Sequence, residues 1–340
     1  MKNRSNVGAA ALAVLAVCLA AWTLTGCAKN SDKPRIGVAI YKFDDTFMST
    51  VRNAISKAGE ENATVEIVDS QNAQPTQNDQ IDNFISRSVK ALAINPVDRT
   101  AAAVIIQKAK AADVPVVFFN REPLASDMQA WDKIYYVGAR AEESGTYQGQ
   151  IAVDYFRGNP GADKNGDGVI QYIMIMGEPG HQDAELRTEY SVKAITDAGL
   201  RVEQLARDTA MWDRVRGQEK MSAFLAAHGE RIELVLCNND DMALGAIEAL
   251  KAEGYNTGGA KYIPVIGVDA TAPALEAIEN GTLLGTVLND GQNQGQAAYD
   301  IAFAVATGAN PSSTGWTLDG GKYVWVPYQM VTRANYLQFK

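Results

Sequence analysis

Short apolar runs alternate with longer stretches of helical periodicity along almost the whole chain. The apolar runs are rich in β-branched residues and carry no polar face, which is typical of parallel strands covered on both sides. They predict strands at residues 35–40, 65–68, 91–94, 114–119, 134–137, 171–176, 202–206, 234–237, 263–268 and 284–288. The stretches between them predict helices at residues 47–57, 77–88, 101–112, 142–156, 184–198, 215–227, 241–253, 273–280 and 292–307.

This alternation repeats too often for one sheet of ordinary width, so it favours two doubly wound α/β domains. The first series of strands and helices ends near Gly138, before the helix predicted from Glu142. A helix follows the strand at 284–288, which suggests that the chain returns to the first domain near Asp290. The pattern contains no low-complexity segment and no short-period repeat.

Residues 1–26 have the character of a secretory signal. Lys2 and Arg4 precede an apolar stretch, and the stretch ends in Leu24-Thr25-Gly26-Cys27. This ending resembles a bacterial lipobox, which predicts a lipid on Cys27 and a short tether over 27–34. An ordinary signal peptide that happens to contain a cysteine is the alternative. A membrane-spanning helix is less favoured, because a small-residue cleavage site follows the apolar stretch directly.

The few cysteines and histidines exclude some kinds of site. Cys18 leaves with the signal and Cys27 takes the lipid, so Cys237 remains as a small core residue in an apolar run. His181 and His228 are the only imidazoles, which gives little support to a zinc site. Without residues 1–27 the chain has 29 basic and 40 acidic residues. This acidity argues against nucleic acid, and against anionic membrane surfaces beyond the lipid anchor.

The segment 163–171 has the oxygen spacing of a calcium loop. Its first, third, fifth and ninth residues have side-chain oxygens, its glycines allow sharp turns, and its seventh residue can offer a carbonyl. In order, these residues are Asp163, Asn165, Asp167, Gln171 and Val169. An EF-hand has Glu at the twelfth position, but Met174 stands there within a predicted strand. A calcium ion would therefore need a carboxylate from elsewhere; the alternative is a polar turn.

Polar groups recur where successive strands end. In doubly wound sheets, ligands bind in loops at the carboxyl ends of the strands. Those loops contain carboxylates, amides, His181 and Arg187, and Phe47 and Trp212 add flat apolar faces. A sugar ring has apolar C–H faces, and its hydroxyls both donate and accept hydrogen bonds. The set favours a carbohydrate, although each residue alone also fits a helix cap or a core position.

Other ligands and activities have weaker support. No phosphate-loop motif and no dinucleotide fingerprint follows the first strand. No G-x-S-x-G is present, and Cys237 has no nearby histidine in the sequence. His181 and Asp183 could act as an acid–base pair on a small sugar, but no activated nucleophile accompanies them. A two-lobed repressor would need a DNA-binding motif where the lipobox stands.

Seven motifs resemble the bacterial galactose/glucose-binding proteins over essentially the whole chain after the signal. They are Ile40–Phe47, Val117–Pro123, Gly177–Arg187, Asp208–Asp213, Asn238–Asp240, Gly267–Asp269 and Gly285–Asp290. The resemblance implies a non-enzymatic, monomeric receptor that delivers D-glucose and D-galactose to the permease of an ABC importer and, in many bacteria, contacts a chemoreceptor. A sugar-sensing subunit of a membrane sensor is the alternative. The resemblance to the galactose/glucose-binding proteins also implies two Rossmann-like lobes of the periplasmic binding protein type I. A three-segment hinge joins an N-terminal lobe (35–138 plus 291–323) to a C-terminal lobe (142–288 plus 327–340).

The resemblance also implies a role for each residue of the site. The residues expected to bond sugar hydroxyls are Asp45, Asn120, His181, Asp183, Arg187, Asn239, Asp269 and Asn289. Phe47 and Trp212 are expected to sandwich the ring. The expected ligands of a structural calcium ion are Asp163, Asn165, Asp167, Val169, Gln171 and the distant Glu233. With Cys27 lipidated, the protein is expected outside the cytoplasm, anchored to the membrane.

Overall fold

The computed structural model describes residues 33–340 of the chain. The predicted signal, the lipobox cysteine Cys27 and almost all of the predicted tether lie outside the described residues. No helix within residues 33–340 is long and apolar enough to cross a membrane.

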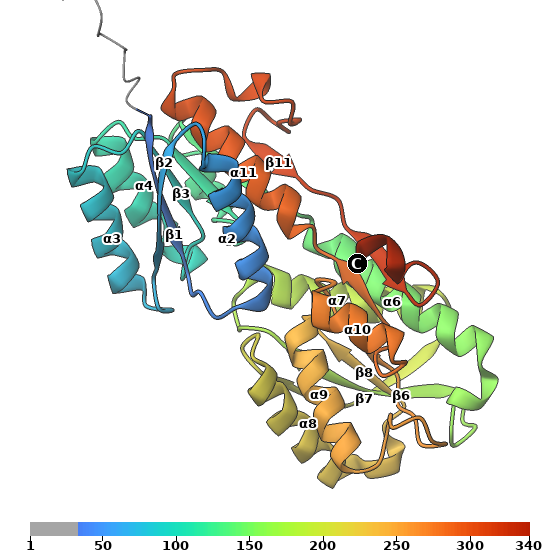
Figure 1. The fold of residues 1–340 in the computed structure, drawn as a ribbon. Coiled ribbons are helices and arrows are strands. Elements are labelled where there is room, and N and C mark those ends of the chain that lie inside the picture. The colour runs from blue at the N-terminus through green and yellow to red at the C-terminus, as the bar shows by residue number, and fades with distance from the viewer. Residues whose placement is uncertain (1–32) are drawn as a thin grey trace, which may run out of the picture. The chain divides into compact units, whose positions relative to one another are not determined.

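One six-stranded sheet forms the core of the N-terminal lobe (Figure 1). Its strands are β1 (Arg35–Ile40), β2 (Thr64–Asp69), β3 (Ala91–Ile94), β4 (Val116–Phe119), β5 (Ile134–Gly138) and β11 (Tyr323–Trp325). They are parallel and lie in the order β11-β5-β4-β3-β1-β2. Helices α2 (Thr46–Gly59) and α11 (Gly291–Ala306) pack on one face, and α3 (Gln74–Ser86) and α4 (Ala102–Ala111) pack on the other. The short helix α5 (Ala125–Met128) precedes β5.

A second six-stranded sheet forms the core of the C-terminal lobe. Its strands are β6 (Val169–Met176), β7 (Arg201–Thr209), β8 (Leu234–Cys237), β9 (Val265–Ile266), β10 (Gly285–Leu288) and β12 (Gln329–Thr332). The order is β12-β10-β9-β8-β6-β7, and only β12 is antiparallel to its neighbour. The helices are α6 (Ala141–Gly158), α7 (Gln182–Asp197), α8 (Arg214–His228), α9 (Asp240–Ala252) and α10 (Ala272–Glu279).

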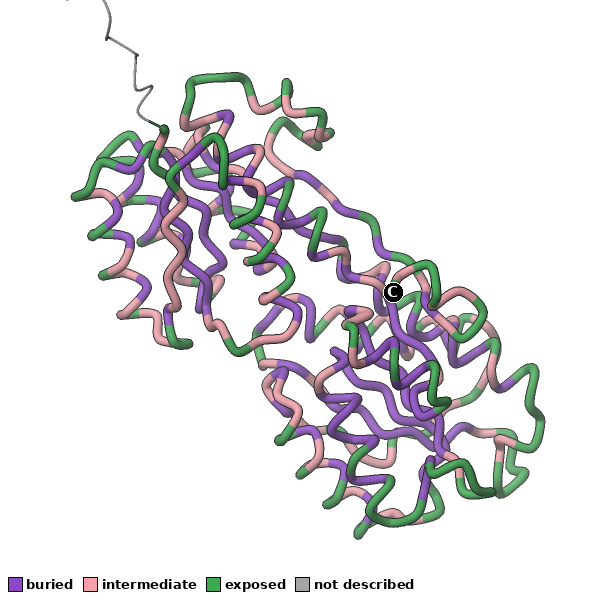
Figure 2. Tube along the Cα trace, viewed as in Figure 1, coloured by how far each residue is buried: buried purple, intermediate pink, exposed green. Residues whose placement is uncertain are grey.

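Each lobe has apolar clusters on both faces of its sheet. Figure 2 shows burial along the strands and exposure along the outer sides of the helices. The β4 residues, for example, are all buried, as expected for a strand that helices cover on two sides. Cys237 at the end of β8 is fully buried, and burial raises the pKa of its thiol. It therefore behaves as a core residue.

The predicted fold class, two doubly wound parallel-sheet lobes, is confirmed. Three details differ from the expectation. The last strand of the second sheet is antiparallel. The strand predicted at 263–268 pairs as a strand only over Val265–Ile266. The edge strand β11 continues to Trp325 in the first sheet, so the chain leaves that lobe slightly later than residue 323. Strand β12 and helix α11 follow the chain's last two passages between the lobes.

Candidate functional site

A cavity between the two sheets contains all ten residues that were expected to contact sugar. It contains about 340 Å³ of space between atoms. The lining side chains follow β1, β4, β6, β7, β8, β9 and β10, so they gather at the carboxyl ends of the strands, as ligand sites in such sheets do. The lining residues are Tyr41, Asp45, Phe47, Met48, Asn120, Arg121, His181, Asp183, Arg187, Trp212, Asn239, Asp269 and Asn289.

The first turn of α2 fixes two of the residues from the N-terminal lobe. Asp45 is the N-cap of this helix, and its Oδ1 accepts the backbone N–H of Met48 at 2.8 Å. Its other oxygen accepts the hydroxyl of Tyr41. Phe47 follows in the first turn and is 8% exposed. The cap therefore holds a carboxylate and a flat ring close together at the start of α2, after the carboxyl end of β1.

Asn120 supplies the amide of the N-terminal lobe. It follows β4 in a left-handed conformation with φ 61°. Its Oδ1 accepts the amide of Asn95 at 3.2 Å, and its carbonyl accepts the hydroxyl of Tyr136 at 2.8 Å. Asn tolerates this backbone region better than most residues. Asn95 therefore orients the side-chain amide of Asn120, and Tyr136 fixes its backbone.

The start of α7 holds a cluster of three buried polar side chains. His181 is the N-cap, and its Nδ1 accepts the backbone N–H of Asp183 at 3.1 Å. Burial, together with Arg121 and Arg187, lowers the pKa of His181 well below its usual range. The imidazole is therefore neutral, and its Nε2–H is a donor. Burial raises the pKa of Asp183, and the positive charge of Arg187 partly offsets this rise.

Arg187 ties this cluster to the rest of the lobe. Its Nη2 lies 2.9 Å from Oδ2 of Asp183, one helical turn before it, and donates to the hydroxyl of Tyr328 at 3.0 Å. Its Nη1 donates to the carbonyl of Asn238 at 2.8 Å. Burial disfavours the guanidinium charge, but Tyr328, Asp183 and Asp269 outweigh it and raise the pKa of Arg187. Its Nε is buried with no hydrogen-bond partner among the described residues, so one donor stays available.

Trp212 provides the apolar face of the C-terminal lobe. It follows β7 with φ 65° and is 9% exposed. The edge of its ring meets the ring of His181 at a centroid distance of 5.0 Å. A Cβ on Gly177 would lie 2.3 Å from Cη2 of Trp212. Only a glycine therefore lets the indole lie against the end of β6.

Three further polar residues complete the site from the same lobe. Asn239 is the N-cap of α9, and its Nδ2 donates to the carbonyl of Trp212 at 3.3 Å. Asp269 has φ 124°, a sparsely populated conformation that concentrates at functional sites. The amide of Asn289 donates to Asp269 at 3.2 Å. Burial raises the pKa of Asp269 well above its usual range, although Arg187 acts against this rise.

The two lobes contact each other directly beside the cavity. Arg121 of the N-terminal lobe forms an ion pair with Glu178 at 2.9 Å between Nη2 and Oε2. Gln182 donates to Glu122 at 2.8 Å and accepts from Arg99 at 3.2 Å. The described structure is therefore a closed arrangement in which the lobes touch around the cavity.

The arrangement can hold a flat, polyhydroxylated molecule. Phe47 and Trp212 come from different lobes and offer apolar faces. Between them lie acceptors such as Asp45 and donors such as Arg187. Chemistry on the ligand has less support, because Asp183 is already bound to Arg187 and neutral His181 caps a helix. Both side chains have positioning roles in the described structure.

The sequence reasoning did not assign a role to Tyr41, Met48 and Arg121, which also line the cavity. Their signal was their position in the loops after β1 and β4, next to residues that were assigned. The guanidinium of Arg121 lies 3.9 Å from the ring centroid of Tyr41 and donates to the carbonyl of Val97 at 2.6 Å. Arg121 therefore packs on Tyr41, whose hydroxyl in turn donates to the carboxylate of Asp45.

The loop at 163–171 has a conformation that its glycines and carboxylates explain. Gly166 and Gly168 have φ of 72° and 71°. Asp163 accepts the backbone N–H groups of both glycines, at 2.7 and 2.8 Å. Asp167 accepts the amides of Asn165 and Gln171, at 2.9 and 3.0 Å. The backbone N–H of Val169 also donates to Asp167 at 2.7 Å, so all five predicted loop ligands take part in one hydrogen-bonded turn.

Glu233 approaches this loop from the residue before β8. It is 1% exposed, and its oxygens accept the backbone N–H groups of Lys164 at 2.5 Å and Gln171 at 3.2 Å. Burial raises the pKa of Glu233, and Asp163 contributes to this rise. No group of three or more His, Cys, Asp and Glu side chains within residues 33–340 is placed to hold a metal ion. Amide and carbonyl oxygens would therefore have to complete a cation site, and this all-oxygen set fits a hard cation.

Known proteins resemble the chain over most of its length. The family model described as a periplasmic binding protein domain matches residues 36–310. The D-galactose/methyl-galactoside binding periplasmic protein of Haemophilus influenzae is 45% identical over 305 residues, which cover 88% of this chain and 90% of the relative. The ribose import binding protein of Bacillus subtilis is 28% identical over 86% of this chain and 88% of its own length.

A solved structure gives the same result for the fold. An ABC transporter solute binding protein from Bacillus halodurans, with bound myo-inositol, has a TM-score of 0.76 and 30% identity. The match covers 92% of this chain and 98% of that protein. The family match, the relatives and the two-lobed fold agree, and the chain belongs to the periplasmic binding protein family.

Proposed function

We propose that this protein is an extracytoplasmic receptor that binds D-galactose and D-glucose between its lobes and delivers them to an ABC importer. The observation that carries the proposal is the cavity that Phe47 and Trp212, from opposite lobes, line together with ten hydrogen-bonding side chains. The 45% identity to a galactose-binding relative supports the choice of hexose. A family of transport receptors also supports binding without chemistry.

Both epimers are expected to bind because stacking uses only the apolar faces of the ring. Selectivity then comes from the buried polar groups. An analogue that lacks a hydroxyl leaves one of them unpaired, at a cost of about 1–3 kcal/mol. The carboxylate of Asp45 is a strong acceptor that can serve a hydroxyl in either orientation. Ribose is a pentose and offers fewer hydroxyl groups than a hexose, so it is expected to bind weakly or not at all.

Titration calorimetry with glucose, galactose and ribose tests this proposal. Trp212→Ala and Asp183→Ala should each weaken hexose binding by tenfold or more, from about 1.4 kcal/mol upward. Asp197→Ala is a matched control, because Asp197 is an exposed carboxylate at the other end of α7. Tight binding of ribose without either hexose would refute the assignment. Chemical change of the recovered sugar would favour the enzyme that uses His181 and Asp183.

A structural calcium ion in the loop 163–171 is part of the proposal. Asp163, Asn165, Asp167, Gln171 and Glu233 would supply side-chain oxygens, and Val169 its carbonyl. The buried carboxylate of Glu233 beside Asp163 supports this, because a cation would relieve the cost that raises its pKa. The ion would connect the loop to the residue before β8 in the same lobe.

Lipidation of Cys27 would tether the receptor to the outer face of the membrane. The support is the Leu24-Thr25-Gly26-Cys27 motif, together with a family whose members work outside the cytoplasm. Cys27→Ser should release the protein from the membrane fraction or leave it unprocessed, with sugar binding intact. Unchanged processing and membrane association would refute the anchor. The resemblance to galactose/glucose-binding proteins also leads us to expect a monomer, and contact with a chemoreceptor or a membrane sensor.

A further inference from the structure

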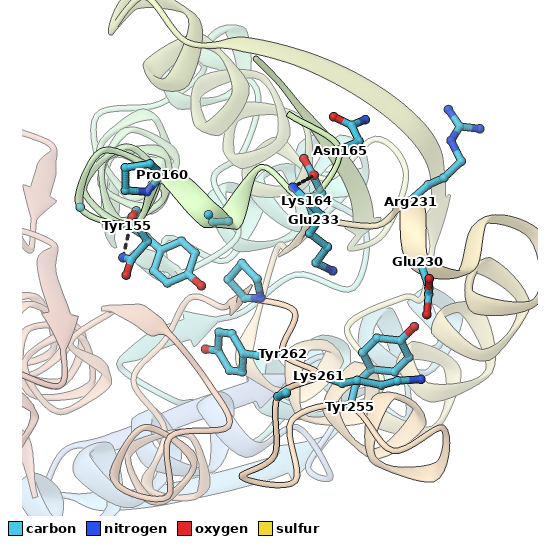
Figure 3. A pocket seen from close by; sticks show the side chains of 16 residues that line it. Tyr155, Pro160, Lys164, Asn165, Glu230, Arg231, Glu233, Tyr255, Lys261 and Tyr262 are labelled. Atoms are coloured by element: carbon cyan, nitrogen blue, oxygen red, sulfur yellow. Dashed lines mark hydrogen bonds between the residues drawn. The ribbon is translucent and has the colours of Figure 1, made fainter. Parts of the chain in front are cut away.

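A second and larger cavity lies at the other end of the C-terminal lobe (Figure 3). It has a volume of about 850 Å³, within the range of small-molecule sites. Its walls come from the end of α6, from the segments that lead into β6 and β8, and from the segment between α9 and β9. These are the amino ends of the strands, so this cavity is separate from the interlobe site at their carboxyl ends.

Three tyrosine rings form the apolar part of this cavity. Tyr155 and Tyr262 lie with their ring centroids 6.4 Å apart and their planes at 54°. The ring of Phe156 supports Tyr155 from behind, edge-on at 5.4 Å. Tyr255 is buried in the opposite wall. None of the three tyrosine hydroxyls has a hydrogen-bond partner within residues 33–340, so each remains both donor and acceptor.

The charged groups around the rings offer donors and acceptors in balance. The ammonium of Lys261 lies 5.3 Å from the ring centroid of Tyr255 and has no ion pair in the described part of the chain. The carboxylate of Glu230 also has no ion pair there, and Figure 3 shows it beside Arg231, on a different segment from Lys261. Arg231 is already paired with Glu203 at 3.2 Å, and Lys164 donates to the carbonyl of Ile232 at 2.8 Å. Lys164 and Glu233 also line the cavity without an ion pair in the described part of the chain, so charged groups of both signs remain.

We infer that this cavity is a second carbohydrate site, which takes a neutral oligosaccharide rather than a single sugar. The tyrosine faces suit the C–H faces of sugar rings, and the free hydroxyls, Lys261 and Glu230 suit sugar hydroxyls. A small anion or cation would meet an unpaired charge of its own sign. The volume of about 850 Å³ exceeds what a monosaccharide fills, so the second cavity has room for a disaccharide or trisaccharide.

Amide NMR of the mature chain saturated with glucose tests this inference. Lactose and maltotriose are the neutral probes, and 4-hydroxybenzoate is an anionic ring of similar flatness. The expected result is a saturable shift of the backbone amides of Gly158, Gly161 and Ala260 with lactose or maltotriose. Because the readout is at these amides, it does not depend on which monosaccharide the interlobe cavity prefers.

Substitutions at the rings separate a built site from surface contact. Tyr262→Ala should weaken oligosaccharide binding tenfold or more and leave the glucose affinity unchanged, which also shows that the variant is folded. Tyr147→Ala is the matched control, because Tyr147 is an exposed tyrosine on α6 outside the cavity. The inference is overturned by absent or unsaturable shifts, by equal affinity of Tyr262→Ala, or by binding of 4-hydroxybenzoate in place of both sugars.

Discussion

Trp212 depends on a residue that has no side chain. Its indole occupies the space where a Cβ on Gly177 would stand, with Cη2 only 2.3 Å from that position. Gly177→Ala should therefore turn the indole away and weaken hexose binding tenfold or more, while the fold remains. Gly259→Ala is the matched control, because a Cβ there would meet nothing within 4 Å. Calorimetry measures both variants, and equal affinities would mean that Trp212 does not stack on the sugar.

His181 gives the site a pH dependence whose sign follows from its burial. The folded protein keeps the imidazole neutral, because burial and three arginines lower its pKa well below 6.5, whereas the unfolded chain is protonated near that value. The unfolded state therefore binds more protons below about pH 6.5, and stability falls as the pH falls.

The loss from this one group approaches about 1.4 kcal/mol per pH unit. Denaturant unfolding between pH 7 and pH 5 measures it as the difference between the parent and His181→Asn, which lacks the titrating group. His228→Asn, at the only other histidine, is the control. Parallel pH profiles of the parent and His181→Asn would contradict the prediction.

At the scale of elements, the loop before β6 is connected to β8 through Glu233. If calcium binds there, it should stabilise the C-terminal lobe by about 2.7 kcal/mol at a hundredfold excess over its Kd. Chelation should lower Tm, and Glu233→Gln should lower Tm and abolish the response to calcium, because a buried carboxylate is lost. Glu230→Gln, three residues away and exposed, should keep the response. Scanning calorimetry with confirmed metal content decides the matter; no shift in Tm on chelation would count against the ion.

The element pattern could be predicted where a strand is buried on both faces. The limits of β1, β3 and β8 follow their apolar runs, since helices cover these strands on two sides. The strand predicted at 263–268 is too long at its start. The N–H of Ile263 donates to Asn256 at 2.8 Å and Pro264 has no N–H, so neither residue can donate to a neighbouring strand. The antiparallel β12 could not be foreseen, because its direction depends on tertiary pairing with β10.

The residues around the interlobe cavity could be predicted for a related reason. They stand in the loops and helix starts that follow predicted strands, and the carboxyl ends of parallel strands meet at one edge of a sheet. Arg121 was harder to assign, because its role depends on Glu178 from the other lobe, and no local pattern pairs them. Nothing in the periodicity indicated the tyrosine-lined cavity either, since its walls come from three separate stretches of the chain.

At the scale of the whole molecule, direct contacts between the lobes hold the closed arrangement. Arg121 and Glu178 form a largely buried ion pair at 2.9 Å, so neutralising one partner leaves an unpaired buried charge. Glu178→Gln should favour the open state. The apparent sugar affinity should then fall in proportion to the fraction of molecules that can still close on the sugar.

Small-angle scattering checks this prediction. The radius of gyration should fall when sugar is added to the parent, and sugar-free Glu178→Gln should have a larger value than the sugar-free parent. Glu189→Gln on α7 is the control, because its carboxylate is exposed and forms no ion pair in the described part of the chain. Identical profiles with and without saturating sugar would rule out hinge closure.

Biosynthesis reaches one edge strand of each lobe only at the end of the chain. β11 joins β5 from residues almost two hundred positions away, and β12 completes the second sheet even later. The ribosome therefore releases a chain in which neither sheet has had its final strand for long. Neither sheet can therefore be completed before nearly the whole chain has been made, which suits a receptor proposed to be exported before it reaches its final fold.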